Sequence, residues 1–261
     1  MKRPSIRAKP MPPDPVFPVV RHTPNASPDA GQGAFLGVLM LQTRFPRLPG
    51  DIGHPESFGV PTRRLVVEGA LAGKVVQEAA GLRASGLLDL FVAAAQRLAS
   101  EGAAAITTSC GFLVLFQRDL QAAVPVPLVT SSLTMLPALL QERAQVGVLT
   151  ISAERLGPEY LEAAGVPAGR RRDVIVEGMP PGGEFARVIF GDRPRMEAAK
   201  VQAEAIAAAR RLQARAPGLD RLVLECTNLP PYAHAIEAAT GLRTCSLLQC
   251  ETLLRPFAAA A

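Results

Sequence analysis

Residues Ala103–Phe116, with the sequence AAAITTSCGFLVLF, contain the pattern that decides the fold of this chain. An apolar run leads into the small polar residues TTSCG at positions 107–111, and a second apolar segment follows. Continuous apolar runs of this length are typical of buried strands in parallel sheets. The stretch therefore predicts a strand, then a turn carrying hydroxyl groups and the thiol of Cys110, and then a helix.

A second stretch, Arg221–Tyr232, repeats this plan with the sequence RLVLECTNLPPY. Here an apolar run ends at Cys226, and two prolines open the next helix. Each cysteine also follows an earlier Gly-Val-Leu strand, which begins at Gly37 in one half and at Gly147 in the other. The repeat predicts a duplicated α/β unit in which the two thiols face one small pocket.

Periodicity along the whole chain predicts an α/β fold of two pseudo-symmetric domains with parallel sheets and an active site in the cleft between them. We expect residues 1–33, which are rich in proline, to form a disordered or loosely packed arm. The first domain is predicted to comprise residues 34–130 plus about 241–261, and the second domain residues 131–240. The predicted strands are Phe35–Leu41, Arg64–Val67, Ala104–Thr107, Val124–Val129, Val146–Leu149, Val174–Val176, Leu222–Leu224 and Leu242–Leu247. The predicted helices are Leu87–Ser100, Phe112–Ala122, Met135–Gln141, Arg155–Ala164, Arg195–Ala214, Ala233–Ala239 and a last one reaching about Phe257.

Composition excludes several classes of function. The net charge of +5 is spread over the 261 residues, with clusters only at Arg170–Arg172 and in the first nine residues, and no aromatic residues are interleaved with them. This argues against a nucleic-acid partner. No C-x-x-C pair occurs and the three histidines lie far from the cysteines, so we expect no metal site. No apolar segment is long enough to span a membrane and no secretory signal is evident, so we expect a cytoplasmic protein with reduced thiols.

The two strand-end thiols suggest a specific kind of chemistry. A cysteine at a helix N-terminus is expected to have a lowered pKa, which favours the thiolate. One thiolate can remove a proton from a carbon acid, and the opposite thiol can return a proton to the other face. Such a reaction needs no cofactor, so Cys110 and Cys226 are the predicted catalytic residues. The alternative is that both are small buried hydrophobes. We expect Cys245 and Cys250, which lack a hydroxyl-rich turn, to be core or near-surface residues.

The candidate substrate-binding residues lie in the strand-end turns and in one long loop. The loop of residues 42–61 follows the first strand and contains Arg44, Arg47 and Asp51. Because ligands bind at the carboxyl ends of strands in open α/β sheets, these side chains are candidates to contact a small carboxylate substrate. They could equally be a turn cap and two surface charges. The remaining candidates have a hydroxyl or amide side chain: Thr108, Ser109, Thr130, Ser131, Thr150, Thr227 and Asn228.

At these residues the chain resembles the aspartate/glutamate racemase superfamily. The sequence CTNLP at 226–230 is similar to the second-cysteine motif of that family, Cys-Thr-His-Tyr-Pro. The sequences TSCGF at 108–112 and PGDIG at 49–53 resemble an uncharacterised branch. The resemblance covers the chain from about Phe35 onward. It implies two pseudo-symmetric α/β domains, cofactor-independent proton transfer by the two cysteines and, commonly, a homodimer.

The chain also departs from the best-known members of that superfamily. Their Asp-Ser after the first strand is replaced by QTR at 42–44, their Cys-Asn-Thr by CGF at 110–112, and the histidine of their second motif by Asn228. The departures indicate a substrate other than glutamate. The sequence thus predicts an amino-acid racemase or epimerase acting on a small carboxylate such as aspartate. Maleate cis–trans isomerase, hydantoin racemase and arylmalonate decarboxylase activities remain open, as does a carboxylate-binding protein or thiol sensor.

Overall fold

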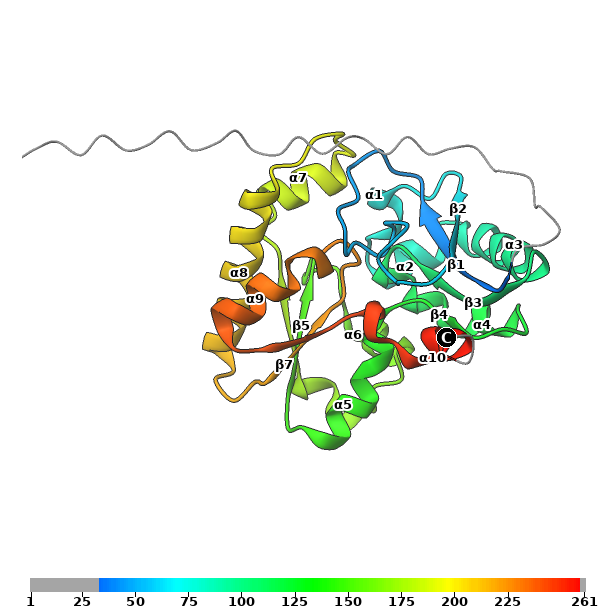
Figure 1. Cartoon of the computed structure of the whole chain (residues 1–261). Helices are drawn as coiled ribbons and strands as arrows, with labels where there is room; N and C mark the ends of the chain where they lie inside the picture. The colour runs from blue at the N-terminus through cyan, green and yellow to red at the C-terminus, as the bar shows by residue number, and fades with distance from the viewer. Residues whose placement is uncertain (1–32, 259–261) are drawn as a thin grey trace, which may run out of the picture.

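The computed structural model describes residues 33–258, so the predicted N-terminal arm lies outside the described residues apart from Gly33. Eight strands are present in this part of the chain: β1 (Phe35–Leu41), β2 (Thr62–Val67), β3 (Ala103–Thr108), β4 (Leu128–Val129), β5 (Val146–Thr150), β6 (Val174–Gly178), β7 (Arg221–Leu224) and β8 (Arg243–Cys245). They form two parallel sheets with the orders β2-β1-β3-β4 and β6-β5-β7-β8. The identical orders confirm the predicted α/β fold of two pseudo-symmetric halves (Figure 1).

Helices pack against both sheets. The α-helices are α1 (Ala72–Val75), α2 (Ala79–Arg83), α3 (Leu87–Ser100), α4 (Gln117–Ala122), α5 (Leu136–Glu142), α6 (Pro158–Ala163), α7 (Glu184–Phe190), α8 (Ala198–Arg215), α9 (Ala233–Thr240) and α10 (Glu251–Leu254). The 3-10 helices are η1 (Gly111–Phe116), η2 (Ser132–Met135), η3 (Ala168–Asp173), η4 (Pro230–Tyr232), η5 (Leu247–Gln249) and η6 (Arg255–Phe257). In α3 the buried residues recur at helical spacing, so one face packs on the first sheet.

In each half, a glycine in the central strand allows a helix to pack closely on the sheet. A Cβ atom on Gly37 would lie 2.9 Å from the side chain of Leu98 in α3. A Cβ atom on Gly147 would lie 2.8 Å from the side chain of Leu212 in α8. Both separations are shorter than real Cβ contacts, so each glycine allows a leucine of the covering helix to approach its sheet closely.

Some predicted elements differ from those observed. The predicted strand Val124–Val129 is reduced to β4, because Pro125 and Pro127 have no N–H group to donate to a ladder. The predicted helix Phe112–Ala122 begins as the 3-10 helix η1 and becomes α-helical only at Gln117. The short helices α1, α2 and α7 were not predicted, since each has seven residues or fewer and too few turns to show a period.

The C-terminal segment returns to the first half. Strand β8 still pairs with β7, so Arg243–Cys245 belong to the second sheet rather than to the first domain predicted to resume at about residue 241. After β8, α10 contacts β3 and β4 of the first sheet. Leu253 of α10 packs in a second, smaller core cluster with Leu36 and Val129 of that sheet. The crossover therefore comes after Cys245, and the division into two folding domains stays a prediction.

Two further findings concern residues 33–258. No helix in this range is long and apolar enough to cross a membrane. No three His, Cys, Asp or Glu side chains in the same range gather closely enough to hold a metal ion.

Candidate active site

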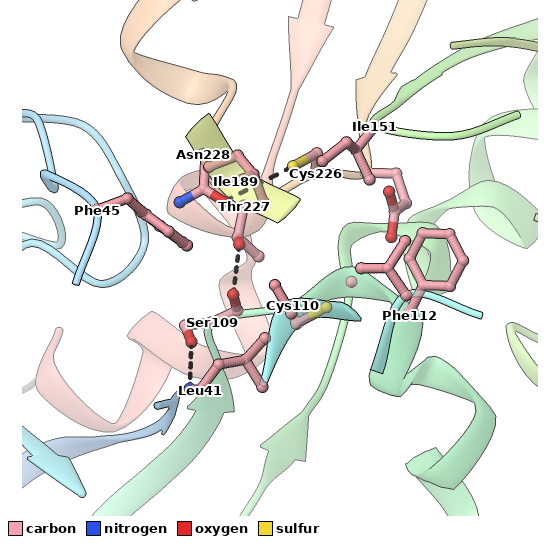
Figure 2. A pocket seen from close by; sticks show the side chains of 14 residues that line it. Leu41, Phe45, Ser109, Cys110, Phe112, Ile151, Ile189, Cys226, Thr227 and Asn228 are labelled. Atoms are coloured by element: carbon pink, nitrogen blue, oxygen red, sulfur yellow. Dashed lines mark hydrogen bonds between the residues drawn. The ribbon is translucent and has the colours of Figure 1, made fainter. Parts of the chain in front are cut away.

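The two cysteine turns meet between the carboxyl ends of the central strands. Cys110 follows β3, and Cys226 lies two residues after the end of β7. The Thr227 hydroxyl donates a 2.6 Å hydrogen bond to the backbone carbonyl of Ser109, which joins the two turns directly. The Ser132 hydroxyl donates a second bond across the halves, 2.8 Å long, to the carbonyl of Leu224. Figure 2 shows the two cysteine side chains entering from opposite sides of the cavity.

The cavity between the turns is small and mostly apolar. Its volume is about 20 Å³, which is the room of about one water molecule. A substrate of several heavy atoms therefore enters only if the lining residues move apart. The polar or reactive lining residues are Ser109, Cys110, Glu225, Cys226, Thr227 and Asn228, and the apolar ones include Leu41, Phe45, Ala72, Val76, Phe112, Ile151 and Ile189.

Burial controls the ionisation of both thiols. Desolvation, followed by the nearby charge of Glu225, raises the pKa of Cys110 to about 12, although the Phe112 backbone N–H and the charge of Arg47 act in the opposite direction. The same two causes raise the pKa of Cys226 well above its usual value. The expectation that the helix N-termini lower these pKa values is therefore wrong. The cysteines are fully enclosed, and a single backbone N–H does not offset the loss of water.

The surroundings of the two thiols nevertheless differ. The Cys226 sulfur lies 3.8 Å from Oδ1 of Asn228, an oxygen that can only accept a hydrogen bond. The Asn228 amide is held in this orientation by a hydrogen bond at its other end, where Nδ2 donates to Oδ2 of Asp51 at 2.5 Å. The negative charge of Asp51 also raises the pKa of Cys226, whereas the positive charge of Arg47 lowers that of Cys110. The arrangement favours a protonated Cys226 and a more readily ionised Cys110.

The charged residues of the loop after β1 support this amide and do not line the cavity themselves, whereas Phe45 of the same loop does. Arg47 and Asp51 are both buried and form an ion pair with a separation of 3.0 Å. Arg47 also donates a hydrogen bond to the Thr43 hydroxyl. Of the predicted loop residues, Asp51 thus reaches the site through Asn228 and Arg47 stands one layer behind it. Arg44 points elsewhere, to an exposed ion pair with Asp192.

Most of the predicted hydroxyl ligands form bonds that hold the turns in place. Thr108 donates to the carbonyls of Cys110 and Thr130, and the Ser109 hydroxyl accepts from the backbone N–H of Leu41. The Thr130 hydroxyl donates to the Gln117 side chain, and the Ser131 hydroxyl accepts from the N–H of Leu133. The Thr150 hydroxyl donates to Glu225. Of the predicted substrate-binding residues, the cavity lining contains Ser109, Thr227 and Asn228.

Glu225 was not among the predicted site residues, yet its carboxyl group lies in the cavity wall. It is 1% exposed, and its Oε2 accepts a 2.6 Å hydrogen bond from Thr150. Its other oxygen, Oε1, is buried and has no hydrogen-bond partner in the part of the chain that the structure describes. Burial raises the pKa of Glu225 to about 7, against the Thr150 bond, which lowers it. The signal available in the sequence was an acidic residue placed between a buried strand and a cysteine.

Comparison with known proteins identifies the family. No family model matches the chain. A dimethylsulfoniopropionate lyase of Durusdinium sp. clade D is 32% identical over 216 residues, which cover 80% of this chain and 70% of that protein. The chain belongs to the dimethylsulfoniopropionate lyase family. Dimethylsulfoniopropionate lyase 7 of Emiliania huxleyi is 31% identical over 217 residues, 79% of this chain but 62% of that longer protein.

Solved structures of a decarboxylase and of racemases share the fold that the cysteine motifs suggested. Arylmalonate decarboxylase superposes with a TM-score of 0.56 at 18% identity, over 87% of this chain and 94% of that one. Glutamate racemase of Francisella tularensis, in complex with D-glutamate, gives 0.51 at 11% identity, over 85% and 79% of the two chains. At such identities the likeness shows a shared fold.

The relatives correct the predicted activity. The expectation of an amino-acid racemase or epimerase is wrong, because the curated relatives are lyases. Neither the racemase prediction nor the alternatives beside it included a carbon–sulfur lyase. The departures at Gly111 and Asn228 were read as a change of substrate within racemase chemistry, whereas the relatives indicate a change of reaction class. That the chain belongs to a family of enzymes follows from its lyase relatives.

Proposed function

We propose that this chain is a lyase that cleaves dimethylsulfoniopropionate or a closely similar sulfonium carboxylate. The observation that carries the proposal is the 32% identity to a dimethylsulfoniopropionate lyase, extending over most of both chains. The enclosed cavity with two thiols supports it, because a β-elimination needs a base beside an acidic carbon and little else.

The proposed reaction balances as a simple elimination. The Cys110 thiolate takes a proton from C2, the carbon next to the carboxylate. The electrons of that C–H bond form the C2–C3 double bond, and the C3–S bond breaks with its electron pair going to sulfur. The products are acrylate, neutral dimethyl sulfide and a protonated Cys110, which gives its proton to solvent water as the next substrate binds. The leaving group departs without a proton, so the reaction needs a single base.

The different surroundings of the thiols support Cys110 as that base. Cys226 faces an acceptor oxygen on Asn228 and the charges of Glu225 and Asp51, all of which favour its protonated form. As a thiol, Cys226 can donate a hydrogen bond toward the carboxylate oxygens, on which negative charge grows as C2 loses its proton. This role differs from that of the second base in a racemase.

The substrate itself helps to ionise the base. With the cavity empty, a Cys110 pKa of about 12 leaves little thiolate near neutral pH. A positive charge within about 4–6 Å lowers the pKa of an acidic group by about 1–3 units. A bound sulfonium cation next to the thiol supplies such a charge. The thiolate then forms chiefly when the correct substrate is present.

The direct test is product analysis with the purified full chain and dimethylsulfoniopropionate. We expect dimethyl sulfide in the headspace, measured by gas chromatography, and an equal amount of acrylate in solution, measured by proton NMR. Cys245→Ser is a matched control, because this half-buried thiol does not line the cavity and its loss should leave the rate unchanged. Exchange of the C2 protons with D₂O without any dimethyl sulfide would contradict the proposal.

A further inference from the structure

We infer that Glu225 is a cation-binding residue, whose free carboxyl oxygen Oε1 receives the positively charged sulfonium group and selects onium substrates over neutral ones. The inference rests on the proposed function and names the feature of the substrate that the site recognises. The wall of the cavity contains an unusual feature, because this carboxyl oxygen is fully buried and has no hydrogen-bond partner among residues 33–258.

The position of this carboxyl group is set by contacts on two sides. Thr150, at the end of β5, donates to Oε2, which leaves Oε1 free to face another group. On the other side Glu225 touches the turn of the first cysteine. A Cβ atom on Gly111 would lie 2.3 Å from Oε1 and 2.3 Å from the Glu225 backbone carbonyl. Any side chain at position 111 would therefore collide with Glu225.

This contact explains a departure noted in the sequence. Gly111 directly follows the first cysteine, and Glu225 directly precedes the second. The Glu225 side chain fills the space that a side chain at position 111 would need, so the two residues depend on each other. Glycine at 111 is not required by its backbone, since no positive φ is found there. It is required because Glu225 fills the space that a side chain would take. The two residues together place an acidic group in the cavity wall, where its charge acts on both thiols.

A buried carboxylate without a cation is costly, which is why a positively charged ligand fits this position. The transfer of an ionised carboxylate out of water is unfavourable unless an opposite charge compensates for it. Among residues 33–258, no Lys or Arg side chain lines this cavity, and Arg47, one layer away, is already paired with Asp51. The remaining wall near Glu225 includes Phe112 and Ile151, which are apolar and suit the methyl groups of an onium ion.

The inference is tested by comparing two unreactive ligands of the same shape. One is 3-(trimethylammonio)propanoate, which carries a cationic head group, and the other is 4,4-dimethylpentanoate, its carbon isostere, in which a neutral tert-butyl group replaces the cation. Their dissociation constants are measured by calorimetry with the wild-type full chain and with Glu225→Gln. We expect the wild-type protein to bind the cation at least about tenfold more tightly than the isostere. In Glu225→Gln the two ligands should bind about equally, with the isostere within about threefold of its wild-type value.

The possible results distinguish whether Glu225 recognises the positive charge of the ligand. Equal binding of the two ligands by the wild-type protein overturns the inference, as does a preference for the cation that Glu225→Gln retains. If the variant does not fold, which its thermal melt will show, the wild-type comparison decides alone. A preference for the cation without release of dimethyl sulfide from dimethylsulfoniopropionate would uphold the onium site and refute the proposed lyase. Loss of turnover with unchanged ligand preference would assign Glu225 to the chemistry instead of to cation recognition.

Discussion

The burial of Glu225 should make the stability of this protein depend on pH in a way that one substitution removes. Burial raises the pKa of this carboxyl group from 4.5 to about 7. The folded state therefore holds the proton more tightly than the unfolded chain. The stabilisation from this group is fully present below pH 4.5 and is lost as pH rises through 7. Since one pKa unit corresponds to about 1.4 kcal/mol, the whole loss is about 3 kcal/mol.

Urea denaturation of the wild type and of Glu225→Gln measures this loss. The glutamine cannot ionise, so the free energy of unfolding of the wild type should fall by about 2–3 kcal/mol relative to the variant between pH 5 and pH 8. The comparison removes the contributions of all other titrating groups. Glu68→Gln, the same change at an exposed position, should show no such difference. Parallel pH profiles for wild type and Glu225→Gln would refute the reasoning that this carboxyl group is buried and unpaired.

Three further predictions concern the walls of the site. Iodoacetamide at pH 8 should modify Cys245 before Cys110 and Cys226, because both cavity thiols are buried whereas Cys245 is only half-buried. Peptide mass spectrometry gives the order, and the reverse order would be inconsistent with this account. Asp51→Asn leaves the buried Arg47 without its counter-charge and should lower the free energy of unfolding by about 3–5 kcal/mol in urea. Phe112→Ala removes a buried ring that packs edge-to-face on Tyr160, with the ring centroids 5.0 Å apart. It should lower the free energy of unfolding by about 3–5 kcal/mol in the same assay, and a decrease below about 1 kcal/mol would contradict this packing.

The sequence revealed the fold because its main signals are local. The strand Phe35–Leu41 and the helix Leu87–Ser100 have the predicted bounds, since continuous apolar runs and a helical apolar period are visible in one window. The repeated cysteine turns also indicated that two halves face each other. Elements of three to seven residues, such as β8 and α7, were shortened or missed, because so short a segment is defined by its tertiary contacts.

The site was predicted less completely, for a physical reason. A sequence shows that Cys110 and Cys226 follow strands, but it does not show how much water remains around them. Burial reversed the expected direction of both pKa shifts. The space shared by Gly111 and Glu225 depends on two segments more than a hundred residues apart, so neither residue alone suggested the contact. The reaction class came only from the relatives, since a pair of strand-end thiols is compatible with several kinds of proton transfer.

The most direct test of the central claim compares the two cavity thiols in one assay. Dimethyl sulfide release from dimethylsulfoniopropionate is measured for Cys110→Ala and Cys226→Ala, with Cys245→Ala as the control. We expect Cys110→Ala to lose the contribution of the general base, at least about 10²–10⁴-fold in kcat/KM. Cys226→Ala should lose less and retain measurable turnover, and Cys245→Ala should match the wild type. Full activity of Cys110→Ala, or a larger loss in Cys226→Ala than in Cys110→Ala, would contradict the assignment of Cys110 as the base.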